Sequence, residues 1–184
     1  PYLYKMGYDG PLYCTKPTRD LMIMLTLDYI GVAHSENNKA PYDSSAIKKA
    51  VKRTITPDYG EVTDITPDMR LTLENSGHII GSSLCHLHVG EGLHNILYTG
   101  DYNYDDTEML REASTDFQRV ETMITESTYG GRDDEQTDRT EANKKFLSKV
   151  KQTLNKGGKV VVPVFAVGRS QEVLGLLADE MDRQ

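Results

Sequence analysis

The sequence has little cysteine, no long apolar run and no excess of positive charge. Its two cysteines, Cys14 and Cys85, form neither a disulfide framework nor a zinc-binding spacing, which favours a reducing compartment inside a cell. No apolar stretch approaches the roughly 18 residues of a membrane span, and no signal peptide is visible. We therefore expect a cytoplasmic protein without a membrane partner, or a nuclear one in a eukaryote. The net charge of −7 argues against nucleic-acid binding by the chain as a whole, but it is compatible with a local basic groove.

Strand-like and helix-like segments follow one another in an order that indicates an α/β chain with mixed sheets. Strands are expected at 11–15, 61–65, 70–74, 82–89, 93–99 and 120–125. Helices are expected from Pro17, from Asp43 or Ser44 as far as Pro57, and over 136–155. A continuous apolar run over 159–165 predicts one further, buried strand, and Gly168 begins the turn into a final helix.

Three glycine-containing blocks each place one acidic or metal-binding side chain directly after an apolar, strand-like run. The blocks are SGHIIGS at 76–82, YTGDYN at 98–103 and TESTYGG at 125–131, and they carry His78, Asp101 and Glu126. Loops at strand ends on a rigid sheet are where catalytic groups usually lie. The three residues are therefore the candidate site.

Each residue has a chemical interpretation and a plainer structural one. The glycines around His78 allow a sharp bend that brings an imidazole to a metal, yet a lone histidine is more often a hydrogen-bonded loop residue. The carboxylate of Asp101 can bridge two cations, or it can simply start a turn. Glu126 at a strand end can orient a catalytic histidine and raise its basicity.

The blocks, in this order, resemble the β-CASP branch of the metallo-β-lactamase superfamily, and especially the endonuclease subunit of the cleavage and polyadenylation specificity factor and its archaeal relatives. The segment PVFAVGRSQE at 163–172 is similar to early β-CASP sequence. The resemblance implies part of a metallo-β-lactamase domain, an αββα sandwich, over 1–130, and the start of an α/β β-CASP domain over 131–184. It also implies a piece of a longer protein, because the family's upstream His-x-His-x-Asp-His motif and two later histidines are missing.

The same resemblance implies a role for each candidate residue. His78 would be a terminal zinc ligand, and Asp101 would bridge the two zinc ions of the complete site. Glu126, the candidate catalytic residue, would orient a histidine acid downstream, but the last histidine of this chain is His94.

Two further features lie outside the three blocks. His86 and His88 share one face of a strand and could chelate a metal, but they do not continue the family's doublet motif, so we interpret them as an ordinary strand face. Gly168 and Arg169 open the final helix, where free N–H groups and a guanidinium could bind RNA phosphate. The alternative is a simple turn in which Arg169 pairs with Glu172.

These observations predict part of a zinc-dependent RNA phosphodiesterase. It would be an endoribonuclease, with 5′–3′ exoribonuclease action as an addition, that works on single-stranded RNA in 3′-end processing or decay. The partner would be a second copy or an RNA-processing complex, bound through regions outside this chain. Two alternatives stay open, namely a catalytically silent scaffold subunit of such a complex and a β-CASP DNA-repair nuclease, although the latter tends toward Asp where this chain has Glu126.

Overall fold

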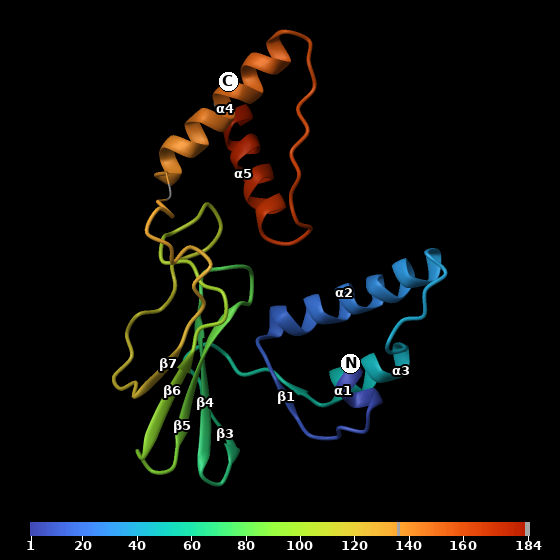
Figure 1. Ribbon diagram of the computed structural model, residues 1–184, viewed down its shortest axis with the longest axis vertical. Helices are drawn as coiled ribbons and strands as arrows, with labels where there is room; N and C mark the ends of the chain where they lie inside the picture. The colour runs from blue at the N-terminus through green and yellow to red at the C-terminus, as the bar shows by residue number, and fades with distance from the viewer. Residues whose placement is uncertain (136, 183–184) are drawn as a thin grey trace.

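A five-stranded mixed sheet, built from the middle part of the chain, carries the candidate residues (Figure 1). The computed structural model describes residues 1–135 and 137–182. The strands, in their order across the sheet, are β3 (Val62–Thr66), β4 (Met69–Asn75), β5 (Ser83–Val89), β6 (His94–Tyr98) and β7 (Thr122–Ile124). This sheet and the helices around it confirm the predicted α/β class, and the ends of these five strands lie within two residues of their predicted ranges.

The direction of the strands decides where their loops meet. The β3–β4, β4–β5 and β5–β6 pairs are antiparallel, whereas β6 and β7 are parallel. Consequently β4, β6 and β7 run the same way, and all three end at one edge of the sheet. The three predicted blocks follow these three strands, so this edge collects them.

The core lies between the sheet and the connection from β6 to β7. Leu84 of β5 and Leu97 of β6 are each 3% exposed and form a cluster with Ala113 of that connection. Phe117 and Val120 pack against the cluster from the same segment. The long connection is thus a structural layer that covers one face of the sheet, and it fixes the position of β7.

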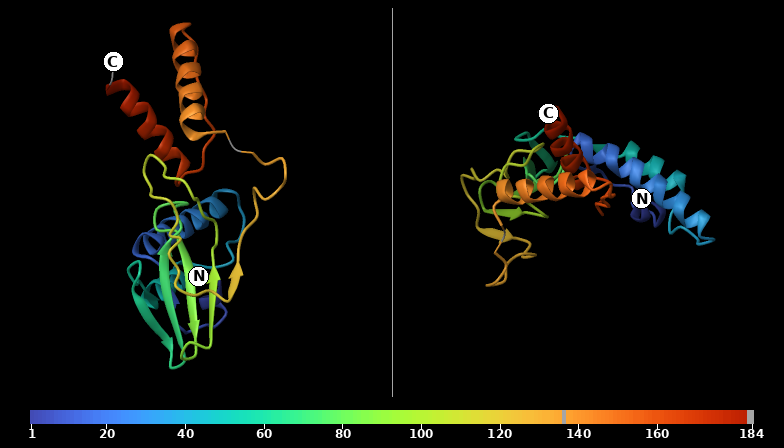
Figure 2. Two further views of the ribbon diagram at one scale, coloured as in Figure 1. Left: turned by 90° about the vertical axis from the view of Figure 1, so that its left-hand side faces the viewer. Right: turned by 90° about the horizontal axis from the view of Figure 1, so that it is seen from above.

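The amino-terminal part forms a separate group of helices on one side of the sheet (Figures 1 and 2). Its elements are α1 (Tyr2–Lys5), β1 (Leu12–Tyr13), α2 (Lys16–Ser35), α3 (Ser44–Lys52) and β2 (Thr54–Ile55). Asp43 is the N-cap of α3, as expected, and its Oδ1 accepts from the backbone N–H groups of Ser45 and Ala46. The helix ends at Lys52 instead of near Pro57, because Thr54 and Ile55 leave it to form a parallel pair with β1.

Helices α4 (Arg139–Asn155) and α5 (Arg169–Asp182) lie beyond the end of the sheet and contact each other (Figure 1). The predicted start of α4 was Gln136, which lies outside the described residues; the helix begins at Arg139, with Asp138 as its N-cap. The boundary predicted near residue 130 falls in the irregular segment between β7 and α4, and its role as a domain boundary stays a prediction.

The predicted buried strand at 159–165 is wrong for this structure. The segment joins α4 to α5 without any strand, and Val161 and Phe165 are 89% and 83% exposed. A strand needs a neighbour for its backbone hydrogen bonds, and no other segment among the described residues pairs with it. The segment is apolar, as its sequence shows, but it can be buried as a strand only where another strand pairs with it.

The centre of the sheet makes a direct prediction for stability. Leu73 of β4 is 2% exposed, whereas Leu93, in the β5–β6 turn, is 76% exposed. We expect Leu73→Ala to lower the free energy of unfolding by about 2–5 kcal/mol, because it leaves a cavity in the core. The matched Leu93→Ala should change it by less than about 0.5 kcal/mol. Urea denaturation of both variants would test this, and equal effects would contradict the described core.

Candidate functional site

The shared edge of β4, β6 and β7 brings the three predicted residues together. His78 follows β4, Asp101 follows β6 and Glu126 follows β7. The Nε2 atom of His78 lies 3.8 Å from Oδ2 of Asp101, and both side chains reach solvent, with exposed fractions of 45% and 68%. The Oε1 atom of Glu126 lies 3.5 Å from the backbone nitrogen of Tyr102, the residue that follows Asp101. The predicted proximity of the three side chains is therefore present, while their roles stay predictions.

Two glycines allow the His78 loop to form. Gly77 has a φ of +68°, and a Cβ there would lie 2.8 Å from the backbone oxygens of Asn103 and Arg111. Gly81 has a φ of +81°, and its Cβ would lie 2.8 Å from Oγ1 of Thr15, at the start of α2. A side chain at either position would be strained and would also collide with its neighbours. The loop that holds His78 thus depends on both glycines.

Serine hydroxyls then fix this loop in place. The Ser82 Oγ accepts from the backbone N–H groups of His78 and Ile79, at 3.2 and 3.1 Å. Ser76 is fully buried, and its Oγ donates to the backbone oxygen of Asp101 at 3.0 Å. Because Ser76 immediately precedes the His78 loop, this bond joins the segments that carry His78 and Asp101.

Glu126 is held in its ionised form. Its Oε2 accepts from the backbone N–H of Thr128 at 3.1 Å, and its Oε1 accepts from that of Tyr102 at 3.5 Å. The hydroxyl of Thr128 contributes most to lowering the pKa of the Glu126 carboxyl below its usual value, and the nearby charge of His78 adds to the effect. A fixed carboxylate of this kind can orient a protonated partner or accept a hydrogen bond from one.

The residues fit only part of a zinc site. His78 and Asp101 offer one nitrogen and one carboxylate on facing loops, which is the ligand chemistry that zinc prefers. A catalytic zinc ion takes three protein ligands, however, and within the described parts of the chain no group of three or more His, Cys, Asp or Glu side chains could hold a metal. Any complete zinc site would need ligands from elsewhere.

His86 and His88 belong to the sheet and not to this edge. His86 is 8% exposed, and its Nε2 lies 3.1 Å from the backbone oxygen of Arg119. His88 bonds to Asn95 through Nδ1, at 2.9 Å, and to Thr72 through Nε2, at 3.3 Å. Burial, and then the neighbouring His88, lower the pKa of His86. Three of their four ring nitrogens thus bond to groups of the sheet or of the segment next to it, as expected of a strand face.

Gly168 and Arg169 reach the candidate site at a single point. A Cβ on Gly168 would lie 2.8 Å from Cγ2 of Ile79, the residue after His78. The backbone N–H of Gly168 donates to the Gln171 side chain at 2.7 Å, and Arg169 pairs with Glu172 at 2.8 Å. In this structure the Gly168 N–H and one nitrogen of the Arg169 guanidinium thus bond within the chain, and their contact with RNA stays a prediction.

Analysis of the sequence missed the serines that build the site. Ser76 and Ser82 flank the His78 block and were treated as part of its spacing, although they supply the bonds described above. A small hydroxyl residue beside a glycine turn was the available signal. This signal does not show which loop the hydroxyl would bond to, because the neighbouring loop is set by the pairing of strands that are distant in sequence.

Comparison with known proteins adds a second line of evidence. A model of the metallo-beta-lactamase superfamily domain matches residues 2–128. The chain is 54% identical over 179 residues to the transcription termination factor FttA of Methanothermobacter thermautotrophicus and 51% identical over 181 residues to that of Methanosarcina mazei. It is also 51% identical over 180 residues to FttA of Pyrococcus abyssi. These matches cover 97 or 98% of the chain but 28% of each relative, so the chain spans less than a third of their length.

The contacts of Glu126 predict its titration. Because its pKa is lowered on folding, the carboxylate contributes stability above the ordinary pKa of glutamate, and that contribution is lost as the pH falls through the folded value. We expect Thr128→Val to raise the pKa of Glu126 toward its ordinary value, because the hydroxyl is removed. The neighbouring Ser127→Ala should leave it unchanged. Carboxyl-detected NMR titration would measure both, and no difference between them would contradict the described contact.

The incomplete ligand set predicts weak zinc binding by this chain. With one histidine nitrogen and one carboxylate, we expect calorimetric titration to show no tight isotherm. Asp101→Ala should then change little. A tight isotherm that Asp101→Ala abolishes would mean that further ligands lie within these residues, with His86 and His88 to be tested first.

Proposed function

This chain belongs to the metallo-beta-lactamase superfamily, as its motifs predicted, and we propose that it supplies part of the active site of a metal-dependent hydrolase that cleaves RNA. The observation that carries the proposal is the approach of His78 to Asp101 at the sheet edge where Glu126 also lies. The superfamily consists typically of hydrolases. Side chains from three strand ends, held by two glycine turns and buried hydroxyl bonds, form an arrangement suited to chemistry and not merely to folding.

Zinc is the metal that we propose for the complete site, with two ions. His78 would be a terminal ligand and Asp101 a bridging one, and further ligands would come from outside the described residues. When bound, the metal would supply an activated hydroxide and would neutralise charge on the phosphate. The contribution of Glu126 is electrostatic, because a carboxylate kept ionised by Thr128 can fix the orientation of a histidine donor.

RNA is the substrate class that the comparisons favour. The relatives that match nearly the whole chain carry the name transcription termination factor, and termination releases a nascent RNA chain. We propose an endonucleolytic cut in single-stranded RNA during 3′-end formation, in the cytoplasm, by a protein that works as a homodimer or within a larger complex. Exonucleolytic trimming from the 5′ end is a second mode that the same site could perform.

A scaffold role is the second candidate function. It is favoured by the lack of a third metal ligand among the described residues and by the pairing of Arg169 with Glu172. Under that proposal the His78–Asp101 approach would be a structural contact without turnover. The two candidates differ in whether these side chains are needed for cleavage.

We would test the proposal on the complete gene product with a labelled single-stranded RNA and zinc. Asp101→Asn should abolish cleavage, because a neutral amide is a poor bridging ligand. Glu126→Gln should lower the rate by about 10–100-fold, as is usual for groups that orient ligands.

Asp105→Asn is the matched control, since Asp105 is a carboxylate on the same loop without a described side-chain partner. It should retain normal activity. Cleavage that survives both Asp101→Asn and His78→Ala would overturn the proposal. An inactive parent protein that still binds RNA would favour the scaffold role.

A further inference from the structure

One segment of this acidic chain carries a strong positive charge. Residues 139–159 contain seven Lys or Arg residues and one acidic residue, Glu141, which gives a net charge of +6. Since the whole chain carries −7, the remaining residues carry −13. The argument against nucleic-acid binding from bulk charge therefore does not apply to α4 and the four residues after it, which present a local basic surface.

The lysines of α4 divide into two sets with different surroundings. Lys151 pairs with Glu180 of α5, and Lys144 lines the cavity between the two helices. Lys145, Lys149 and Lys156 follow one another at spacings of four and seven residues, which places them along one line of a helix. We call these three residues the lysine strip.

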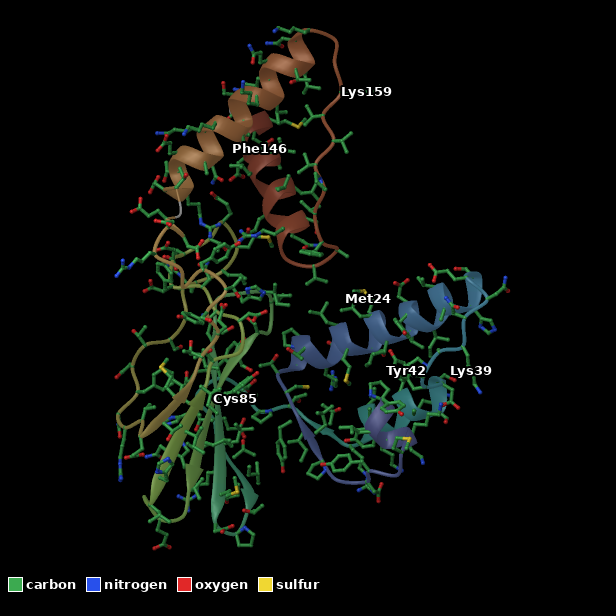
Figure 3. The ribbon with its side chains drawn as sticks, viewed as in Figure 1. Met24, Lys39, Tyr42, Cys85, Phe146 and Lys159 are labelled. Carbon is green, nitrogen blue, oxygen red and sulfur yellow. The ribbon has the colours of Figure 1, made fainter. Side chains whose placement is uncertain are left out.

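The strip faces solvent, away from α5. Its three residues are all exposed. The half-buried apolar residues Phe146 and Val150 lie on another side of the helix, and Figure 3 shows Phe146 on the side of α4 that faces α5. Packing against α5 therefore does not account for the strip.

Known structural roles account for only part of the lysine strip. Lys145 pairs with Glu141 one turn earlier, at 2.6 Å, but such an exposed pair contributes little stability. Lys156 is the C-cap, where a cation interacts favourably with the helix dipole. For Lys149, and for the alignment of all three, the ion pairs found in the described residues offer no partner. Lys149 and the alignment of the three side chains are therefore available to a ligand of opposite charge.

The spacing suits a flexible polyanion. At 1.5 Å per residue the Cα atoms of the strip are about 6 and about 10.5 Å apart along the helix axis. Lysine presents a compact charge on a flexible stem, which suits successive phosphates of an unstructured strand and reads no bases. Helix α4 also begins just beyond the sheet edge with the candidate site and leads away from it (Figure 1). A strand bound along the helix would thus extend from the site.

We propose that Lys145, Lys149 and Lys156 form a docking surface for the phosphate backbone of single-stranded RNA, outside the site that cuts it. The inference rests on the proposed function, because RNA is the polyanion that such a hydrolase would meet. The surface would hold RNA regardless of sequence and would keep one flank of the strand near the edge that carries His78 and Asp101.

The test measures binding, without cleavage. A labelled oligouridylate of about 20 nucleotides is titrated with the full chain in EDTA, at several salt concentrations. Changing all three strip lysines to Gln should weaken binding at low salt. It should also reduce the slope of log affinity against log salt by about 2, since each contact to a single strand contributes about 0.7. Oligoadenylate should give the same reduction, because the contacts are to phosphate.

The chain offers a matched control in α3. Lys48, Lys49 and Lys52 are also three exposed lysines on one short helix, so changing them to Gln removes the same charge elsewhere. We expect this variant to retain the slope of the parent. Glutamine is a good helix former, and circular dichroism of both variants should match the parent.

Three results would overturn the proposal. They are an equal loss in both variants, no loss in either, and a strip variant that loses binding to polyglutamate but not to RNA. The last would assign the surface to an acidic protein. The outcome is separable from that of the proposed function: Asp101→Asn should bind RNA with the parental slope whether or not the complete protein cleaves it.

Discussion

The direction of the strands is the constraint on which the candidate site depends. Three antiparallel pairings followed by one parallel pairing make β4, β6 and β7 end at the same edge. Had β7 joined in the antiparallel sense, Glu126 would lie at the opposite edge from His78. The location of the site is thus a consequence of the strand topology, and the side chains at that edge supply its chemistry.

Hydrogen bonds from side-chain hydroxyls to the backbone then hold the loops at this edge in a defined geometry. The buried hydroxyl of Ser76 joins the two loops that carry His78 and Asp101, and Thr15, the N-cap of α2, donates to the backbone oxygen of Gly81 at 2.6 Å. The His78 loop is therefore held from two sides, by the sheet and by a helix distant in sequence. The candidate side chains reach solvent, but the groups beneath them are buried and satisfied, as a preorganised site requires.

Much of this arrangement follows from local sequence. Strand-like apolar runs located all five strands of the sheet, and the glycine-containing blocks that follow three of them located His78, Asp101 and Glu126. The predictions that were wrong depended on which segments pair with one another as strands. The run at 159–165 has the composition of a buried strand but no neighbour among the described residues, and Ile55 continued a helical pattern yet pairs with β1. Periodicity reports what a segment can bury, whereas pairing is decided by segments far away in the chain.

The parallel β6–β7 pair carries a cost in chain entropy that the other pairs avoid. Residues 90–93 connect β5 to β6, whereas residues 99–121 connect β6 to β7, a connection roughly six times as long. Closing the longer loop costs about 1.5 kcal/mol more, by the logarithmic dependence on loop length. Of the three candidate residues, Glu126 is therefore the one whose place at the edge costs the most conformational freedom. The apolar cluster of Leu84, Leu97 and Ala113, which holds that connection on the sheet, offsets this cost.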